Sequence, residues 1–126
     1  MSDEVRDLTR EVGLLIHRLQ CWSGSSWDVP VESGGTRAER AVRLLDELAS
    51  LGERAGTGAP AGARPPRLAP HALTDQLAVL ADELVAAISV SGAAAPSGRD
   101  VLAAARAAVL EARRDLDGAG FGFRPR

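Results

Sequence analysis

The chain has 126 residues, and its 15 basic and 17 acidic side chains give a formal net charge of −2. This near-neutral balance provides no basic patch of the kind that nucleic acid or an anionic membrane surface requires, so we expect neither as a partner. The only cysteine, Cys21, cannot form an intrachain disulfide, and no apolar run is long enough for a signal peptide or a membrane span, so we expect a cytoplasmic protein. All the basic residues are arginine, and lysine, asparagine and tyrosine are missing, which is typical of a GC-rich bacterium.

Residues 3–22 show the first helical pattern. Apolar side chains recur there at alternating spacings of three and four residues, which is the pattern of a helix that buries one narrow stripe. The stripe consists of Val5, Leu8, Val12, Leu15, Leu19 and Trp22.

Residues 37–55 form the second predicted helix. Thr36 followed three residues later by Glu39 is a capping-box sequence, and Gly56 is a suitable C-terminal stop. Glu39 and Arg43 stand four residues apart, so we expect them to pair. The apolar stripe is formed by Ala38, Ala41, Leu45, Leu48 and Ala55, with Val42, Leu44 and Leu51 beside it.

Residues 56–70 are rich in Gly, Ala and Pro, which break helices, and we expect a linker there. The linker is long for a helical bundle, and when extended it exceeds the length of the helices that it joins. It therefore allows either a tight turn or a crossover, and the order of the helices in space stays open.

Residues 71–91 form the third predicted helix, beginning near Pro70, which suits the first turn. Its apolar surface is broad, and polar side chains are few: chiefly Asp75, Gln76, Asp82 and Glu83. A helix this apolar is usually buried on more than one side.

Residues 98–117 form the fourth predicted helix, and its many alanines let neighbouring backbones approach closely. Arg113 and Asp117 are spaced to pair. Residues 118–126, which include Phe121 and Phe123, are expected to form a flexible tail. Residues 1–117 thus predict a single all-α domain, a four-helix bundle of undetermined topology. The alternative is two helical hairpins that swap or pair across a dimer.

The sequence contains no set of residues that indicates catalysis or metal binding. His17 and His71 form no ligand pair at helical spacing, so we expect no metal and no cofactor. The acidic neighbours Asp46–Glu47 and Asp82–Glu83 are best interpreted as solvated helix faces. His17 precedes Cys21 by one helical turn, a spacing that would let the imidazole activate the thiol, but we favour a structural thiol because no orienting group accompanies the pair.

Both tryptophans lie in the segment QCWSGSSWDVP, at Trp22 and Trp27. We expect Trp27 to fold over one end of the bundle as a lid. The alternative is that Trp27 is exposed and anchors a partner protein. In an up-down-up-down bundle, Phe121 and Phe123 would lie at the opposite end from Trp22. The motif Trp22-Ser23-Gly24 resembles the Trp-x-Gly turn of the small helical-hairpin proteins exported by type VII secretion systems. The resemblance covers only the first fifty residues, the loop is longer, and the tyrosine of that family's export signal is missing, so the chain is not assigned to the family.

These patterns favour a small non-enzymatic protein that acts through protein–protein interaction, as an adaptor or regulatory subunit that self-associates into a homodimer. The broad apolar surface of residues 71–91 is the main reason. The alternative is a bundle that binds a small molecule, or performs catalysis, in an apolar pocket near Trp22. The candidate partner or pocket residues are Trp22, Trp27, His17, Cys21, Phe121 and Phe123.

Overall fold

The computed structural model describes residues 3–56, 62, 64–91 and 96–118. Within these ranges the chain forms the helices α1 (Asp3–Gln20), α2 (Arg37–Ala55), α3 (Leu73–Ser91) and α4 (Pro96–Gly118). Two short 3-10 helices, η1 (Gly24–Asp28) and η2 (Pro70–Ala72), precede α2 and α3. The described residues include no strand, only an isolated bridge between Pro30 and Thr36. The predicted all-α four-helix bundle is therefore confirmed.

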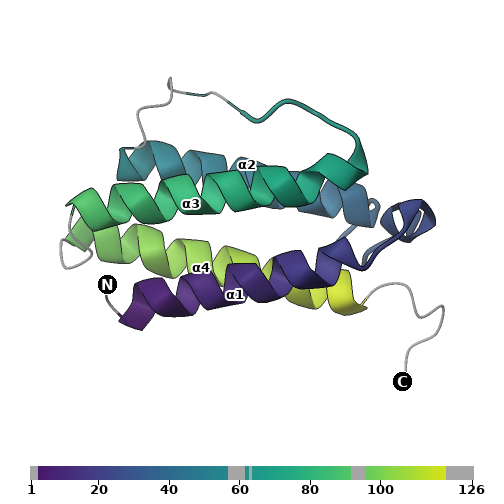
Figure 1. Cartoon of the computed structure of the whole chain (residues 1–126), viewed down its shortest axis with the longest axis horizontal. Helices are drawn as coiled ribbons and strands as arrows, with labels where there is room; N and C mark the ends of the chain where they lie inside the picture. Colours follow the sequence, from purple (N-terminus) through teal and green to yellow (C-terminus); the bar gives the residue numbers. More distant parts are fainter. Residues whose placement is uncertain (1–2, 57–61, 63, 92–95, 119–126) are drawn as a thin grey trace.

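Helices α1 and α4 run in the same direction, and α2 and α3 run in the opposite direction (Figure 1). Ion pairs between α1 and α4 follow the same order along both helices: Asp7–Arg106 at 3.9 Å, Glu11–Arg113 at 3.0 Å and Arg18–Asp117 at 2.9 Å. Each of α1 and α2 packs against both α3 and α4, so α1 and α2 lie diagonally across the bundle. Because α2 and α3 are parallel, the connection between them is a crossover. Consecutive helices do not pack as antiparallel hairpins, either as α1 with α2 or as α3 with α4.

The apolar stripes predicted from the sequence meet in one core. The α1 stripe is buried from Val5 to Leu19, and Trp22 packs half-buried at its end. On α4, Ala105 and Ala112 have no exposed surface, which shows that small side chains there let the neighbouring helices approach closely. The fully buried leucines and Ile88 form the centre of the core, at Leu8, Leu15, Leu19, Leu44, Leu45, Leu48, Leu73, Leu84, Ile88 and Leu116.

Helix α2 has the predicted bounds and the predicted cap. The Thr36 hydroxyl accepts a hydrogen bond from the Glu39 amide at 3.2 Å, and the Glu39 carboxylate accepts one from the Thr36 amide at 2.9 Å. Gly56 ends the helix at φ 84°, in the left-handed region that glycine adopts without strain. Because Glu39 is used in the cap, the expected Glu39–Arg43 pair is not formed, and Arg43 instead donates to Ser33 and Gly34.

Three helix ends differ from the prediction by two residues. Helix α1 ends at Gln20 because the amides of Cys21 and Trp22 bond three residues back, which tightens the last turn and leads the chain into η1. Helix α3 begins at Leu73 because Pro70–Ala72 forms a 3-10 turn. Helix α4 begins at Pro96, a residue that favours the first helical position.

Replacing Gly13 with alanine is expected to raise the free energy of unfolding by about 0.5–1 kcal/mol, because Gly13 lies within α1 and an added Cβ meets nothing within 4 Å. Gly56→Ala is the matched control and is expected to lower it by about 1 kcal/mol, because an alanine at φ 84° is strained. Chemical denaturation of both variants measures the two changes. A loss of stability in Gly13→Ala would contradict the open surface at this position.

Candidate functional site

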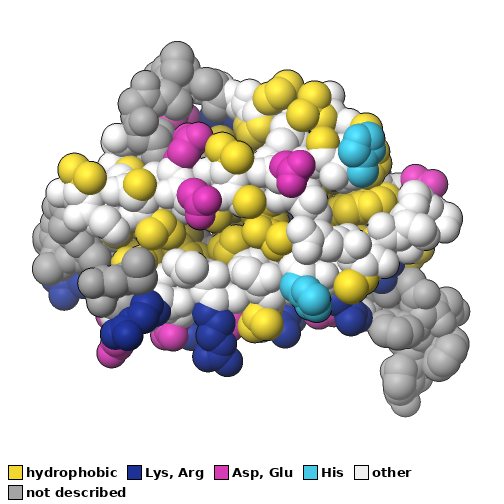
Figure 2. Space-filling view, viewed as in Figure 1, with side chains coloured by type: hydrophobic (Ala, Val, Ile, Leu, Met, Phe, Trp, Pro, Cys, Tyr) yellow, Lys and Arg dark blue, Asp and Glu magenta, His cyan; other side chains and the backbone are white. Residues whose placement is uncertain are grey.

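The exposed side of α3 combines apolar and acidic side chains. Val79 is 54% exposed and Val90 is 89% exposed, and Ala86 between them is also exposed. These positions share one side of the helix with three exposed carboxylates, and α3 contains no basic residue. Figure 2 shows acidic side chains standing along α3 among apolar surface, while the basic side chains in this view lie chiefly over α1 and α4. We call this surface the α3 outer face; it comprises Asp75, Val79, Asp82, Glu83, Ala86 and Val90.

A cavity of about 430 Å³ lies beside this face, between α2, α3 and the end of the crossover. Residues 64–69, which we call the strap, pass over the junction of the two helices (Figure 1). Two consecutive prolines in the strap lack amide hydrogens and favour extended backbone, which prevents a helix there. We call the cavity the strap groove; its walls are mainly apolar and include Leu48, Gly52, Pro65, Pro66, Leu68, Val79 and Leu80.

Ion pairs with α2 hold the strap in place. Arg67 donates to both carboxylate oxygens of Asp46, at 3.1 and 3.0 Å, and these hydrogen bonds raise the pKa of Arg67. Arg64 donates to Glu53 at 3.1 Å. Glu53 also accepts a hydrogen bond from the Gly62 amide. The hydrogen bond from Gly62 and, to a smaller extent, the one from Arg64 lower the pKa of Glu53. The interpretation of Asp46–Glu47 as a solvated helix face holds for the exposed Glu47, whereas Asp46 is half-buried and is one of the two anchors of the strap.

The charged side chains that line the strap groove are Arg64, Asp75 and Glu83. Arg64 is paired with Glu53, whereas none of the ion pairs among the described residues involves Asp75 or Glu83. Gln76 also lines the groove and donates to the carbonyl of Pro66 at 2.9 Å. Its Oε1 atom is buried and accepts no hydrogen bond from the described residues. The unbalanced charge at the groove is therefore negative.

The tryptophans lie together at the end of the bundle where α1 and α4 finish. Trp27 is 3% exposed, which confirms the lid and excludes an exposed anchor at this position. Its ring meets that of Trp22 edge to face, with centroids 5.1 Å apart and an interplanar angle of 78°. The guanidinium of Arg37 lies 4.1 Å from the centre of the Trp22 ring. Burial, followed by repulsion from Arg18, lowers the pKa of Arg37, although Asp117 opposes this.

The structure brings together only some of the other candidate residues. A pocket of about 300 Å³ is lined by Trp22, Trp27 and His71, but His17 and Cys21 do not line it. Both are exposed, and the Cys21 thiol donates to the His17 backbone carbonyl at 3.4 Å. Phe121 and Phe123 lie outside the described residues. Since α1 and α4 finish side by side, the up-down-up-down premise that separated them from Trp22 does not hold.

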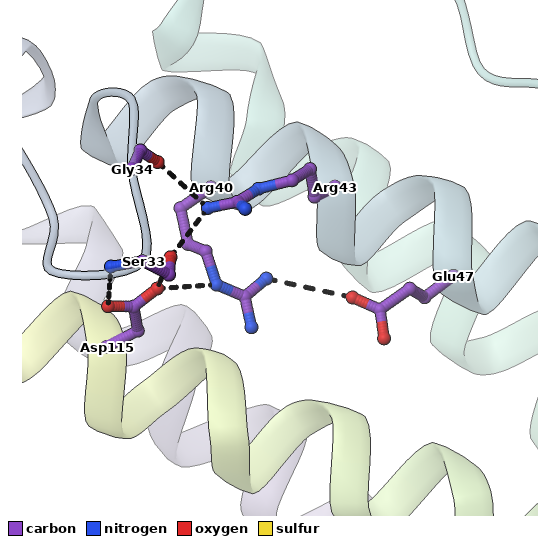
Figure 3. Close-up of polar contacts among 6 residues, drawn as sticks. All are labelled: Ser33, Gly34, Arg40, Arg43, Glu47 and Asp115. Carbon is purple, nitrogen blue, oxygen red and sulfur yellow. Dashed lines mark hydrogen bonds and ion pairs between the residues drawn. The ribbon is translucent and has the colours of Figure 1, made fainter.

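A polar cluster joins the loop before α2 to helix α4 (Figure 3). Asp115 accepts a hydrogen bond from Arg40 at 2.8 Å and also accepts from the amide and hydroxyl of Ser33. The Arg43 guanidinium donates to the Ser33 hydroxyl at 2.8 Å and to the Gly34 carbonyl at 3.1 Å, and Glu47 lies 3.7 Å from Arg40. The cluster contains no histidine and no unpaired nucleophile, so its chemistry is that of a structural clamp.

The buried members of this cluster determine its electrostatics. The side chains of Arg40 and Asp115 are 8% and 11% exposed. Burial by itself raises the pKa of Asp115, but the hydrogen bonds from Ser33 and Arg40 and the charge of Arg40 outweigh burial, so the pKa lies below its ordinary value. Asp115 is therefore ionised at neutral pH and compensates the charge of Arg40.

Other classes of site receive no support from the described residues. No group of three His, Cys, Asp or Glu side chains among them is arranged to hold a metal ion. None of the helices in the described ranges is long and apolar enough to cross a membrane. No protein-family model, curated protein or solved structure matches the chain.

Two features of the site were missed by the sequence analysis. The 56–70 segment was considered only as a connection, although its Pro-Pro pair flanked by Arg64 and Arg67 is a signal for an extended segment with two anchors. The sequence also offered no sign that Arg37 and Arg40 are buried, at 8% and 7% exposure. Their partners lie in the Trp loop and on α4, and helical spacing within α2 carries no information about those contacts.

Proposed function

We propose that this protein acts by binding another protein and that the α3 outer face is its docking surface. The occupant is a helix of the partner that presents basic side chains among apolar ones. One observation supports the proposal. Val79 and Val90 are 54% and 89% exposed, and they share one face of α3 with three carboxylates and no basic residue.

The apolar side chains supply the area for docking. Val79, Ala86 and Val90 follow one side of α3 at separations of seven and four residues. These are the spacings at which a second helix packs along the first. Helix axes in such contacts approach to about 8–10 Å, which would remove all three side chains from water.

The acidic side chains select the sign of the partner's charge. None of Asp75, Asp82 and Glu83 takes part in an ion pair among the described residues. A basic partner helix gains from these carboxylates in affinity and in association rate, and an acidic one is repelled.

The same charges argue against self-association at this face. A twofold dimer formed through α3 would bring the Asp82 and Glu83 side chains of both copies together, because they lie at the middle of the helix. The homodimer predicted from the broad apolar surface of residues 71–91 stays a prediction, and light scattering across a concentration series tests it through the mass in solution.

The docking proposal is tested with a pair of dye-labelled synthetic helices. Both have leucine at the seam positions; one has lysine at the remaining positions and its twin has glutamate. Fluorescence anisotropy is expected to show saturable binding of the lysine helix and none of the glutamate helix. The double variant Asp82→Asn/Val90→Ser is expected to weaken binding by about tenfold, since it removes roughly 1.4 kcal/mol of contact.

Leu14→Ser is the matched control, because Leu14 is 42% exposed on α1 and lies away from the docking face. It is expected to bind the lysine helix like the wild type. Equal binding of the two synthetic helices, or an equal loss in Leu14→Ser, would show that the α3 outer face is not a specific docking surface.

A further inference from the structure

We infer that the strap groove is a binding site for a linear aliphatic molecule with a cationic head group. This inference does not rest on the docking proposal: the groove shares Asp75, Val79 and Glu83 with the α3 outer face, whereas the docking variants alter Asp82 and Val90, which lie outside the groove.

The shape of the groove fits an aliphatic chain. Its volume of about 430 Å³ lies within the range of small-molecule sites, roughly 300–1,000 Å³, and is too small for a helix of a partner protein. Leu48 of α2, Leu80 of α3 and the strap residues Pro66 and Leu68 all line it, so a guest exchanges water for apolar contacts from three segments. Leu68 is 49% exposed, so about half of its apolar surface remains available for contact with a guest.

The charge of the groove selects the head group. Asp75 and Glu83 line it without an ion-pair partner among the described residues, whereas the strap cations Arg64 and Arg67 are paired with Glu53 and Asp46. The two free carboxylates are eight residues apart, about 12 Å along the helix, so each end of the groove is acidic. An ammonium head at either end meets a carboxylate, whereas an anionic head is repelled.

Gln76 gives a second reason for a head group that donates hydrogen bonds. Its amide nitrogen is fixed by the Pro66 carbonyl, and its buried oxygen accepts no bond from the described residues. An unpaired buried acceptor is unfavourable, and an ammonium group carries three donors, so a rotation of the Gln76 side chain that exposes this oxygen to the guest would satisfy it. A carboxylate head offers none.

The test is calorimetry with three molecules of equal chain length: decylammonium, decanol and decanoate, each below its micelle-forming concentration. One-to-one binding is expected, tightest for decylammonium and weakest for decanoate. Octylammonium, which is two methylenes shorter, is expected to bind about 15-fold more weakly than decylammonium, because each buried methylene contributes about 0.8 kcal/mol. Equal or tighter binding of decanoate, or no binding of decylammonium, overturns the inference.

Variants locate the site. Ala49 lines the groove and is half-buried, so Ala49→Leu is expected to fill it and to weaken decylammonium binding at least tenfold. Asp75→Asn/Glu83→Gln is expected to remove the preference for decylammonium over decanol while leaving the fold intact, since both carboxylates are exposed. Asp82→Asn is the matched control, an exposed acid on α3 outside the groove, and is expected to bind like the wild type. Unchanged binding in Ala49→Leu would place the guest elsewhere and overturn the inference.

Discussion

Replacing Trp27 with alanine is expected to lower the free energy of unfolding by about 3–5 kcal/mol, the range for large aromatic side chains removed from a core. Trp27 is 3% exposed, and its ring forms the edge-to-face contact with Trp22. Its removal opens a cavity at the end of the bundle and leaves the Trp22 ring without its aromatic neighbour. Urea denaturation followed by circular dichroism measures the loss without relying on tryptophan fluorescence.

Trp27→Phe separates volume from the specific contact. Phenylalanine keeps an aromatic ring in the core, so a smaller loss than that of Trp27→Ala is expected. Trp22→Ala is the second comparison: Trp22 is only half-buried, so it should cost less than Trp27→Ala. A loss below about 1 kcal/mol in Trp27→Ala would show that the Trp loop does not fold onto the bundle as the structure has it.

Asp115→Asn is expected to lower the free energy of unfolding by about 2–4 kcal/mol. The variant leaves the Arg40 guanidinium, whose side chain is 8% exposed, without its carboxylate at 2.8 Å. Breaking a buried pair from one side is costly because the remaining charge stays desolvated. The range is set slightly below that of fully buried pairs because Glu47 remains 3.7 Å from Arg40. Asp117→Asn is the control, since its partner Arg18 is half exposed and a loss below about 1 kcal/mol is expected.

The effect of Asp115 also fixes a pH dependence. Its pKa in the folded protein lies below the ordinary value, so the unfolded chain binds the proton more tightly. The stabilisation is therefore fully present above the unfolded pKa of about 4 and is lost as the pH falls through the lower folded pKa. Wild type and Asp115→Asn should differ by a constant amount near neutrality and converge below about pH 4. A difference that widens on acidification would reverse the sign and contradict the assigned interaction.

The sequence predicted the helices because their patterns are local. Heptad spacing identified the buried residues of α1, and the Thr36–Glu39 capping box placed the start of α2 correctly. The lid over the bundle end was also anticipated, since Trp27 follows an apolar stripe that ends at Trp22. These predictions succeed because helix formation and burial of one stripe depend on neighbours within a few residues.

The topology and the sites depend on contacts that no local pattern encodes. The 56–70 linker is long enough for either a turn or a crossover. The Arg67–Asp46 ion pair that holds the crossover joins residues 21 positions apart, and no local sequence pattern indicates it. Burial of Arg40 likewise requires Asp115, which lies 75 residues away in the sequence. The strap groove exists only because the crossover returns over α2 and α3, so its lining from three separate segments was beyond the reach of sequence reasoning.

The parallel arrangement of α1 with α4, and of α2 with α3, has a consequence for how the chain folds. Neither α1 with α2 nor α3 with α4 forms a closely packed hairpin, so no short segment can bury its apolar stripe early and locally. Pairing of α1 with α4 closes loops of 99 and 102 residues, as in Arg18–Asp117 and Glu11–Arg113. The entropy of closing such loops must be overcome before the contacts form. We therefore expect this bundle to fold more slowly than an up-and-down bundle of equal length, and to unfold as one cooperative unit rather than hairpin by hairpin.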